Sequence, residues 1–280
     1  MRVWIAGAGF GRGRVLDAEE ARVPALDHGI TVGDGVFETV KGVGGEPFAL
    51  TRHLRRLARS AAGIGLPSPD LDLIADGVRQ AMDANSDIQA ARVRITVTDG
   101  PGPLGSTRSG GEPTYIVAVG EFGEIAPTAD VAVVPWTRNE NDVLSGLKTT
   151  SYAGNVVALD YARQRDCAEA IFANTAGNLC EGTGSNIFLV LDGRLVTPPL
   201  SAGPLAGITR ELVLEWAGGD EADIPMAALA DASEAFLTGT GRDVQPIRMV
   251  DGRALPAAPG PVTRKTMEVF TERGASDMDP

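Results

Sequence analysis

Lysine is scarce in this chain, so each lysine is a candidate for chemistry. Of the 25 basic residues, only Lys41, Lys148 and Lys265 are lysines. Lys148 lies among apolar, small and hydroxyl residues, and the nearest preceding acid along the chain is Asp142. A lysine in a partly desolvated pocket loses its proton more easily, which suits an amine that forms a Schiff base. The local sequence leaves open a second reading, a surface lysine whose stem packs while its ammonium reaches water.

Two further charged residues suit the binding of a cationic ring and of a phosphate. Glu181 precedes the run Gly182–Asn186, and it is either an ordinary loop carboxylate or the partner of a cationic ring nitrogen. Arg56 belongs to a predicted helix that also carries Arg52, Arg55 and Arg59. Most of these arginines should be solvated, and one turned inward could grip a phosphate bidentately. We expect the neighbouring His53 to be a structural hydrogen-bonding residue.

Two later segments suit an anion. Gly207, Ile208 and Thr209 open a predicted helix, where unpaired N–H groups and the positive end of the helix dipole point outward. The segment 238–241, which includes Thr240, closes a predicted strand with small hydroxyl residues. Each segment alone is a weak signal, because many helix starts and glycine turns share this composition.

Several classes of site are disfavoured by composition. The chain has two cysteines, Cys167 and Cys180, and two histidines, His28 and His53. These numbers do not support a disulfide framework or a zinc site, so we expect no metal. The glycine cluster 7–13 has arginines where the third glycine of a dinucleotide fingerprint would stand, and it predicts a hairpin turn.

Charge and hydropathy limit the class of partner. The net charge is −12, which disfavours a nucleic-acid binder because such proteins cluster Lys and Arg. Apolar runs are too short to span a membrane, and the first residues do not form a signal peptide. The sequence therefore predicts a cytoplasmic protein that binds a small molecule, with no membrane or nucleic-acid partner.

The elements that must position these residues form a mixed α+β pattern. Alternating or continuous apolar runs predict strands, and apolar residues at spacings of three and four predict helices. The predicted strands cover about 3–5, 32–40, 93–98, 115–119, 131–134, 170–172, 187–190, 195–196, 235–237 and 244–249. The predicted helices cover about 50–64, 70–85, 156–165, 208–216 and 261–270. The polar stretch 121–128 contains Pro127 and predicts a linker between a smaller N-terminal α/β domain, 1–120, and a larger C-terminal domain, 129–280.

Taken together, six ordered blocks resemble the class IV aminotransferases, which are fold-type IV pyridoxal-phosphate (PLP) enzymes. The family includes branched-chain and D-amino-acid aminotransferases and 4-amino-4-deoxychorismate lyase. The resemblance covers nearly the whole chain. The blocks are Asp27–Gly29 with Gly33–Thr39, His53–Leu57, Leu147–Tyr152, Glu181–Phe188, Leu205–Arg210 and Thr238–Thr240 through Pro246.

The resemblance implies a role for each matching residue. Lys148 matches the lysine that forms the Schiff base with PLP and then acts as the base on the substrate Cα. Glu181 matches the carboxylate that pairs with the pyridinium nitrogen. Four residues match phosphate ligands: Arg56, Ile208, Thr209 and Thr240. The resemblance also implies a D-amino-acid-aminotransferase-like fold, with PLP between two α/β domains of a homodimer.

The family's reactions differ after the proton transfer, and the residues favour one of them. Lys148–Tyr152 resembles lyases and D-amino-acid aminotransferases more than branched-chain enzymes. Asp99 stands where D-amino-acid aminotransferases carry an arginine for the substrate carboxylate, which disfavours that subclass. The sequence therefore predicts a 4-amino-4-deoxychorismate lyase that releases pyruvate and forms p-aminobenzoate for folate. The alternative is an aminotransferase of the D-amino-acid or branched-chain type on the same scaffold.

Substrate carboxylates need cations near the reacting centre. Three arginines are candidates: Arg94, Arg138 and Arg242. Arg94 should lie on the face of its strand opposite Val93 and Ile95, and Arg242 follows the glycine turn after Thr240.

Overall fold

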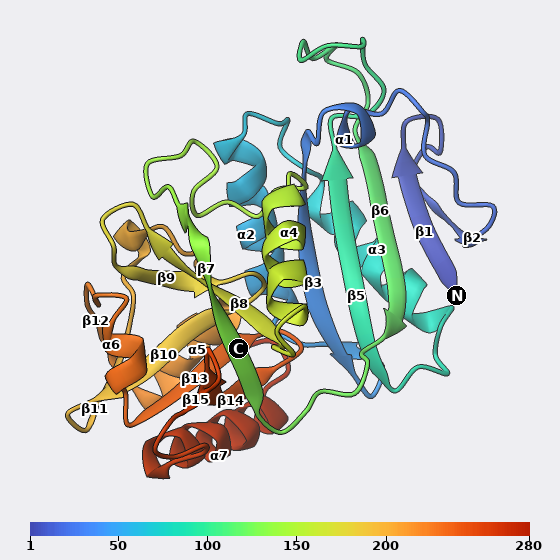
Figure 1. Ribbon diagram of the computed structural model, residues 1–280. Helices are drawn as coiled ribbons and strands as arrows, with labels where there is room; N and C mark the ends of the chain where they lie inside the picture. Colours follow the sequence, from blue (N-terminus) through green and yellow to red (C-terminus); the bar gives the residue numbers. More distant parts are fainter. The chain divides into compact units, whose positions relative to one another are not determined.

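The computed structural model describes residues 1–280, which divide into two compact units (Figure 1). The N-terminal unit contains Met1–Gly123 together with Leu147–Ser151 and Met278–Pro280, and the C-terminal unit contains Glu124–Gly146 and Tyr152–Asp277. The division after residue 123 lies inside the segment 121–128. The sequence-based domains differ at 278–280 and at 147–151, both of which they place in the C-terminal domain. The segment 147–151 joins the N-terminal unit because its backbone hydrogen-bonds to a strand there.

The N-terminal unit is an antiparallel sheet with helices on one face. Its six strands follow the order β2-β1-β6-β5-β3-β4. The strands are β1 (Arg2–Gly7), β2 (Arg14–Asp17), β3 (Gly35–Val43), β4 (Glu46–Pro47), β5 (Ala90–Thr98) and β6 (Thr114–Glu121). The helices are α1 (His28–Thr31), α2 (Leu50–Gly63) and α3 (Leu71–Asp83). As predicted, the glycine cluster forms the turn of a hairpin, in which β1 pairs with β2.

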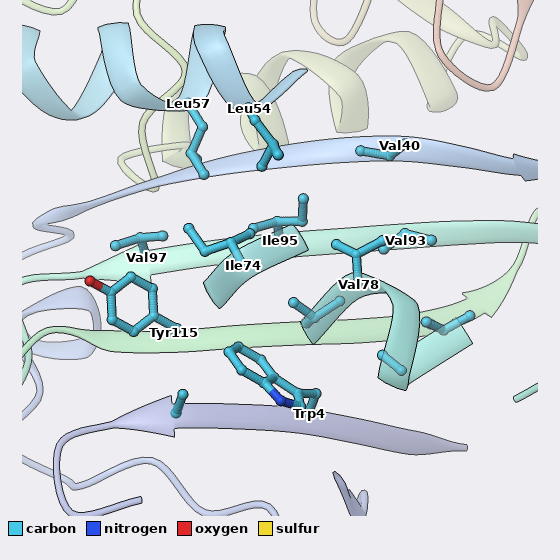
Figure 2. Close-up of a cluster of buried hydrophobic side chains, with 14 of the residues drawn as sticks. Trp4, Val40, Leu54, Leu57, Ile74, Val78, Val93, Ile95, Val97 and Tyr115 are labelled. Carbon is cyan, nitrogen blue, oxygen red and sulfur yellow. The ribbon is translucent and has the colours of Figure 1, made fainter. Parts of the chain in front are cut away.

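The core of this unit follows from the periodicities of strand and helix. On β5, Val93, Ile95 and Val97 are buried while Arg94 between them is half-buried, because successive strand residues point to opposite faces. Figure 2 shows Leu54 and Leu57 of α2 above β3, beside Val40. The buried face of the sheet, which includes Glu38, thus lies against α2 and α3, and the other face carries Thr39 and Lys41 of β3 with Arg92 and Arg94 of β5.

The C-terminal unit is built on a nine-stranded mixed sheet. The strand order is β12-β11-β10-β13-β14-β7-β8-β9, and β15 pairs with β14. The strands are β7 (Ala129–Arg138), β8 (Glu169–Asn174), β9 (Leu179–Gly182), β10 (Asn186–Leu191), β11 (Arg194–Thr197), β12 (Asp220–Glu221), β13 (Glu234–Gly239), β14 (Asp243–Val250) and β15 (Arg253–Ala254). The helices are α4 (Ala153–Arg163), η1 (Leu200–Ala202), α5 (Ile208–Ala217), α6 (Ala228–Asp231) and α7 (Pro261–Ser276).

The parallel pairing in this sheet requires a crossover. β7 and β8 run parallel, and α4 connects them. α5 and α7 pack against each other, and their residues Trp216 and Phe270 have ring centroids 5.4 Å apart. No helix of the chain is long and apolar enough to cross a membrane.

The first prediction concerns Gly77, in the middle of α3. An alanine there would ordinarily stabilise a helix by about 1 kcal/mol. A Cβ at residue 77 would, however, lie 2.6 Å from the ring of Trp4, which is fully buried. Overpacking of this kind costs about 1–3 kcal/mol. We therefore expect Gly77→Ala to lower the free energy of unfolding, measured by urea denaturation.

Gly154 in α4 provides the matched control, because a Cβ there meets no atom within 4 Å. We expect Gly154→Ala to leave stability unchanged or slightly raised. Equal effects of the two substitutions would contradict the packing of α3 against Trp4.

Candidate active site

Lys148 is fixed to the N-terminal unit by its backbone. Its N–H donates to Ser60 Oγ at 3.1 Å, and its carbonyl accepts from the N–H of Phe37 at 3.0 Å. The next residue, Thr149, forms an antiparallel bridge with Val36 of β3. The segment therefore lies alongside β3 like a further strand, and this pairing determines where the Lys148 amine emerges.

The side chain of Lys148 lies over an aromatic ring that it shares with a second cation. Lys148 Nζ is 4.5 Å from the centroid of the Phe37 ring, and Arg94 Cζ is 3.4 Å from the same centroid. Arg94 Nε also donates to Thr96 Oγ1 at 3.3 Å. Arg94 lies on the strand face opposite Val93 and Ile95, as the sequence predicted. The geometry thus groups an amine and a guanidinium around Phe37.

Arg56 is buried in α2 and is held by a carboxylate that sequence reasoning did not single out. Arg56 Nε donates to Glu38 Oε1 at 2.8 Å, and Arg56 Nη2 donates to Glu38 Oε2 at 2.6 Å. His53 Nδ1 lies 2.7 Å from the same Oε2. Arg56 is thus the inward-facing arginine of α2, while Arg55 and Arg59 are exposed.

The Glu38 pair changes how Arg56 could hold an anion. The bidentate edge of the guanidinium, Nε with Nη2, already binds Glu38. This edge is therefore not the one that would hold the phosphate proposed from the sequence. The missed signal was Glu38 itself, a charged residue at an inward position between Val36 and Val40.

Burial and charge act in opposite directions on this group. Burial would raise the pKa of Glu38, but the charge and hydrogen bonds of Arg56, with the hydrogen bond of His53, hold that pKa well below its usual range. Burial lowers the pKa of His53, although Glu38 opposes the shift. The cluster therefore holds an ionised carboxylate, a guanidinium and a neutral imidazole.

In the C-terminal unit, Glu181 on β9 is half-buried, with a hydrogen bond to one carboxylate oxygen and a cation near the other. Glu181 Oε2 accepts from the N–H of Leu205 at 2.9 Å, and Arg138 Nε lies 3.6 Å from Glu181 Oε1. The Arg138 guanidinium also stacks over Phe172, with Cζ 4.4 Å from the ring centroid. Arg138 is thus a partner of Glu181, a contact that sequence reasoning did not anticipate.

Leu205, in the loop just before α5, links the start of that helix to Glu181. Asn186 Nδ2 donates to the carbonyl of Leu205 at 2.8 Å, so Leu205 is held from both sides. A Cβ on Gly207 would lie 1.9 Å from Asn186 Oδ1, so only glycine fits at this N-cap position. Ile208 and Thr209 follow as the first residues of α5, whose N-cap has no side chain to cap their N–H groups.

Thr240 lies in the turn that follows β13. In the pairing of β10 with β13, Asn186 is opposite Thr238, two residues before Thr240. The turn is therefore near the strand end that braces Gly207. Asn186 of β10 therefore adjoins both segments that the sequence singled out separately, 207–209 and 238–241.

Arg242 was a candidate for binding a substrate carboxylate, and in the structure its guanidinium binds Glu169 instead. Its Nη2 donates to Glu169 Oε2 at 3.0 Å and to the carbonyl of Ala168 at 3.2 Å, and its Nη1 donates to Gln245 Oε1 at 2.5 Å. Glu169 is buried and also accepts from the N–H of Thr183 at 2.9 Å. These contacts place the guanidinium against a buried carboxylate, whose charge it offsets.

Comparisons with known proteins identify the family of this chain. A family model for the class IV amino-transferases matches residues 35–250. A protein of Methanocaldococcus jannaschii named as a branched-chain-amino-acid aminotransferase is 34% identical over 277 residues, covering 93% of this chain and 94% of that one. The D-alanine aminotransferase of Staphylococcus haemolyticus is 30% identical over 287 residues, covering 94% and 96%.

Solved structures give the same picture of the fold. The branched-chain aminotransferase of Thermoproteus uzoniensis, crystallised with norvaline, superposes with a TM-score of 0.88 at 32% identity, covering 97% of this chain and 94% of that one. A Legionella pneumophila structure described as a 4-amino-4-deoxychorismate lyase gives a TM-score of 0.85 at 22% identity, covering 91% and 97%. At that identity the likeness to the lyase concerns the fold alone.

The second prediction is a pH dependence that arises from Glu38 and His53. The pKa of Glu38 is lower in the folded than in the unfolded chain, so its stabilisation is present above about pH 4.3 and is lost as pH falls below that value. The lowered pKa of His53 acts in the same direction, with stability falling as pH drops through about 6.5. We expect urea unfolding to report a free energy that decreases from pH 8 to pH 4.

Two variants separate these contributions. His53→Gln should remove the decrease near pH 6.5, and Glu38→Gln should cost about 3–5 kcal/mol at pH 8 by leaving Arg56 buried without its partner. The double variant Glu38→Gln with Arg56→Gln should recover part of that loss. A Glu38→Gln protein as stable as the parent would contradict the ion pair.

Proposed function

Because the chain belongs to the class IV aminotransferase family and is a PLP-dependent enzyme, we propose that it is an aminotransferase acting on branched-chain or similarly apolar L-amino acids. The observation that carries the proposal is the grouping of Lys148 and Arg94 around Phe37. A guanidinium near the reacting amine suits an amino acid, whose α-carboxylate and α-amino group are attached to one carbon.

Residues that match the family's cofactor ligands suit the chemical groups of PLP. The N-terminal unit offers the Lys148 amine for the aldehyde and the Arg56 guanidinium for the phosphate. The C-terminal unit offers the Glu181 carboxylate for the ring nitrogen, and the N–H groups of Ile208 and Thr209 for the phosphate. Thr240 would add a hydroxyl donor near that helix start. When bound, PLP supplies an electron sink for the negative charge that develops at the substrate Cα.

The side chains of this chain would then act on the proton of the substrate Cα. The Lys148 amine would take the proton from the substrate Cα as a general base, and the resulting ammonium would give that proton back as a general acid. Arg94 holds the substrate carboxylate and so orients the Cα–H bond toward Lys148. The Glu181 carboxylate would pair with the ring nitrogen, and the Arg138 guanidinium lies beside that carboxylate.

The lyase predicted from the sequence is less well supported than the aminotransferase alternative. The relatives that share about a third of their residues with this chain are named for amino transfer, and the lyase likeness is limited to the fold. The D-alanine aminotransferase relative makes D-amino acids the second candidate substrates. Asp99 argues against them, since it stands where those enzymes are expected to carry an arginine. We also propose a homodimer, as the family resemblance implies.

The third prediction is the outcome of a substrate panel on the purified holoenzyme. Transfer from L-leucine, L-isoleucine, L-valine and D-alanine is measured with 2-oxoglutarate as acceptor, and p-aminobenzoate is measured with 4-amino-4-deoxychorismate as substrate. We expect amino transfer from the L-amino acids and no p-aminobenzoate. Pyruvate and p-aminobenzoate released without an acceptor would establish the lyase instead.

The same assay tests the role of Arg94 with a matched control on the same strand face. Arg94→Gln should raise KM for the amino acid at least about tenfold, because it removes a charged hydrogen-bond donor to the carboxylate. Arg92, two residues earlier, stacks over Phe122 with Cζ 4.6 Å from the ring centroid and is exposed. Arg92→Gln should leave KM unchanged. Equal effects would remove Arg94 from the substrate site.

A further inference from the structure

A buried group of metal-binding side chains lies in the N-terminal unit, at the ends of three elements. His28 opens α1, Asp34 directly precedes β3 and Asp99 directly follows β5. His28 Nδ1 is 3.8 Å from Asp99 Oδ2 and 4.0 Å from Asp34 Oδ2, and the three ligand atoms all lie within 4.8 Å of one another. We call this group the His–Asp cluster.

Two atoms of the His–Asp cluster lack a hydrogen-bond partner despite their burial. His28 is 0% exposed and Asp99 is 2% exposed, yet His28 Nδ1 and Asp99 Oδ2 have no partner. Burying a polar atom without a partner costs about 1–3 kcal/mol, so such atoms need an explanation. Both atoms lie within 4.8 Å of each other and of an oxygen of Asp34.

The orientation of His28 is that of a metal ligand. His28 Nε2 is 2.9 Å from the carbonyl oxygen of Pro103, and a carbonyl can only accept, so Nε2 carries the proton. In the neutral ring, Nδ1 then presents a lone pair to the carboxylates. Gly102 also packs against the ring, since a Cβ there would lie 2.3 Å from His28 Nε2. A ligating histidine characteristically uses its other nitrogen in this way, to fix its tautomer and its ring plane.

A direct ion pair between a protonated His28 and the carboxylates explains the geometry less well. Distances of 3.8 and 4.0 Å exceed those of an N–H···O hydrogen bond. A charged Nδ1–H would be buried without an acceptor at bonding distance. A metal ion bonds nitrogen and oxygen ligands at about 2.0–2.2 Å, so it could lie between His28 Nδ1 and the carboxylate oxygens after a small inward movement of these side chains.

Arg108 supports Asp34 from outside the His–Asp cluster. Arg108 Nε donates to Asp34 Oδ2 at 2.7 Å and its Nη2 donates to Asp34 Oδ1 at 2.6 Å, while Nη1 and Nη2 also donate to the carbonyls of Gly65 and Ile64 at 2.6 and 2.7 Å. Hydrogen bonds to a ligating carboxylate are typical of the surroundings of metal sites. Two carboxylates and one guanidinium leave a net negative charge of one unit, which a divalent cation would more than offset.

We propose that His28, Asp34 and Asp99 form a binding site for a divalent first-row transition metal ion such as Zn²⁺. The imidazole nitrogen favours such ions over Mg²⁺, which prefers oxygen ligands and octahedral geometry. This proposal departs from the sequence-based expectation of no metal, because the ligands are spread from residue 28 to residue 99 without local motif spacing. It does not depend on the proposed function.

The bound ion would brace the segment that holds the reactive lysine. The carbonyl of Gly33 accepts from Thr150 Oγ1 at 2.8 Å, and the carbonyl of Gly35 accepts from the N–H of Thr150 at 2.8 Å. Asp34 lies between these two carbonyls, and Thr150 is two residues from Lys148. Fixing Asp34 to α1 and β5 would therefore stiffen the pairing of 147–151 with β3.

The fourth prediction is tested by metal binding to the purified holoenzyme. After treatment with a chelator, the protein is titrated with ZnCl₂ by calorimetry, and bound metal is measured by mass spectrometry. We expect about one Zn²⁺ per chain, a rise in Tm with added Zn²⁺, and a smaller rise with Mg²⁺. No bound Zn²⁺, or no preference for Zn²⁺ over Mg²⁺, would overturn the proposal.

Three variants locate the ion. His28→Gln keeps a donor for the Pro103 carbonyl but lacks Nδ1, and Asp99→Asn keeps the shape of Asp99 but lacks its charge. Each should weaken Zn²⁺ binding at least about tenfold. Asp87→Asn changes an exposed acid of the same unit and should bind Zn²⁺ like the parent. Undiminished binding in both His28→Gln and Asp99→Asn would place the ion elsewhere and refute the site.

Discussion

The pairing of residues 147–151 with β3 is the constraint on which the proposed chemistry depends. Lys148 comes after β7 in the chain, yet its backbone bonds to Phe37 and Ser60, and Thr149 bridges to Val36. A lysine side chain is long and flexible, so its amine can be aimed only if its backbone is held. These strand-like hydrogen bonds hold the backbone and do not involve the side-chain amine.

β3 distributes two functions between its two faces. Glu38 points toward α2 and binds Arg56 and His53, whereas Phe37 lies on the face where Arg94 and the Lys148 amine meet. The alternation of a strand separates these groups although they are adjacent in sequence. A one-residue slip in register would exchange the two faces and destroy both groupings. The proposed phosphate ligand and the proposed substrate ligand thus depend on one strand.

The parts of the fold that the sequence predicts are those with a clear period. The alternation along residues 93–98 and the apolar stripe along 50–64 correspond to β5 and α2. The short elements β12 and α6 were not predicted, because two to four residues are too few to show a period. The hairpin at the glycine cluster 7–13 was also predicted. Arg12 and Arg14 stand where a dinucleotide fingerprint needs glycine, which left a turn as the reading of the cluster.

The partners of charged residues were harder to predict than the residues themselves. The family resemblance singled out Lys148, Glu181 and Arg56, but the partners Glu38 and Arg138 depend on long-range register. Arg242 was expected to meet a substrate, and it binds Glu169, which lies 73 positions away in the chain. A local pattern shows that a cation is present, whereas the carboxylate it neutralises is known only once the strands are placed. Inward charges on strands, such as Glu38, are the best sequence signal of such pairs.

The most direct test of the account is to identify the residue that carries the cofactor. The purified protein is incubated with PLP, reduced with borohydride and digested, and the modified peptide is identified by mass spectrometry. The account predicts that the label is on Lys148 and that the visible absorbance of the holoenzyme is lost in Lys148→Ala. A label on Lys41 or Lys265, or an unlabelled Lys148, would contradict it.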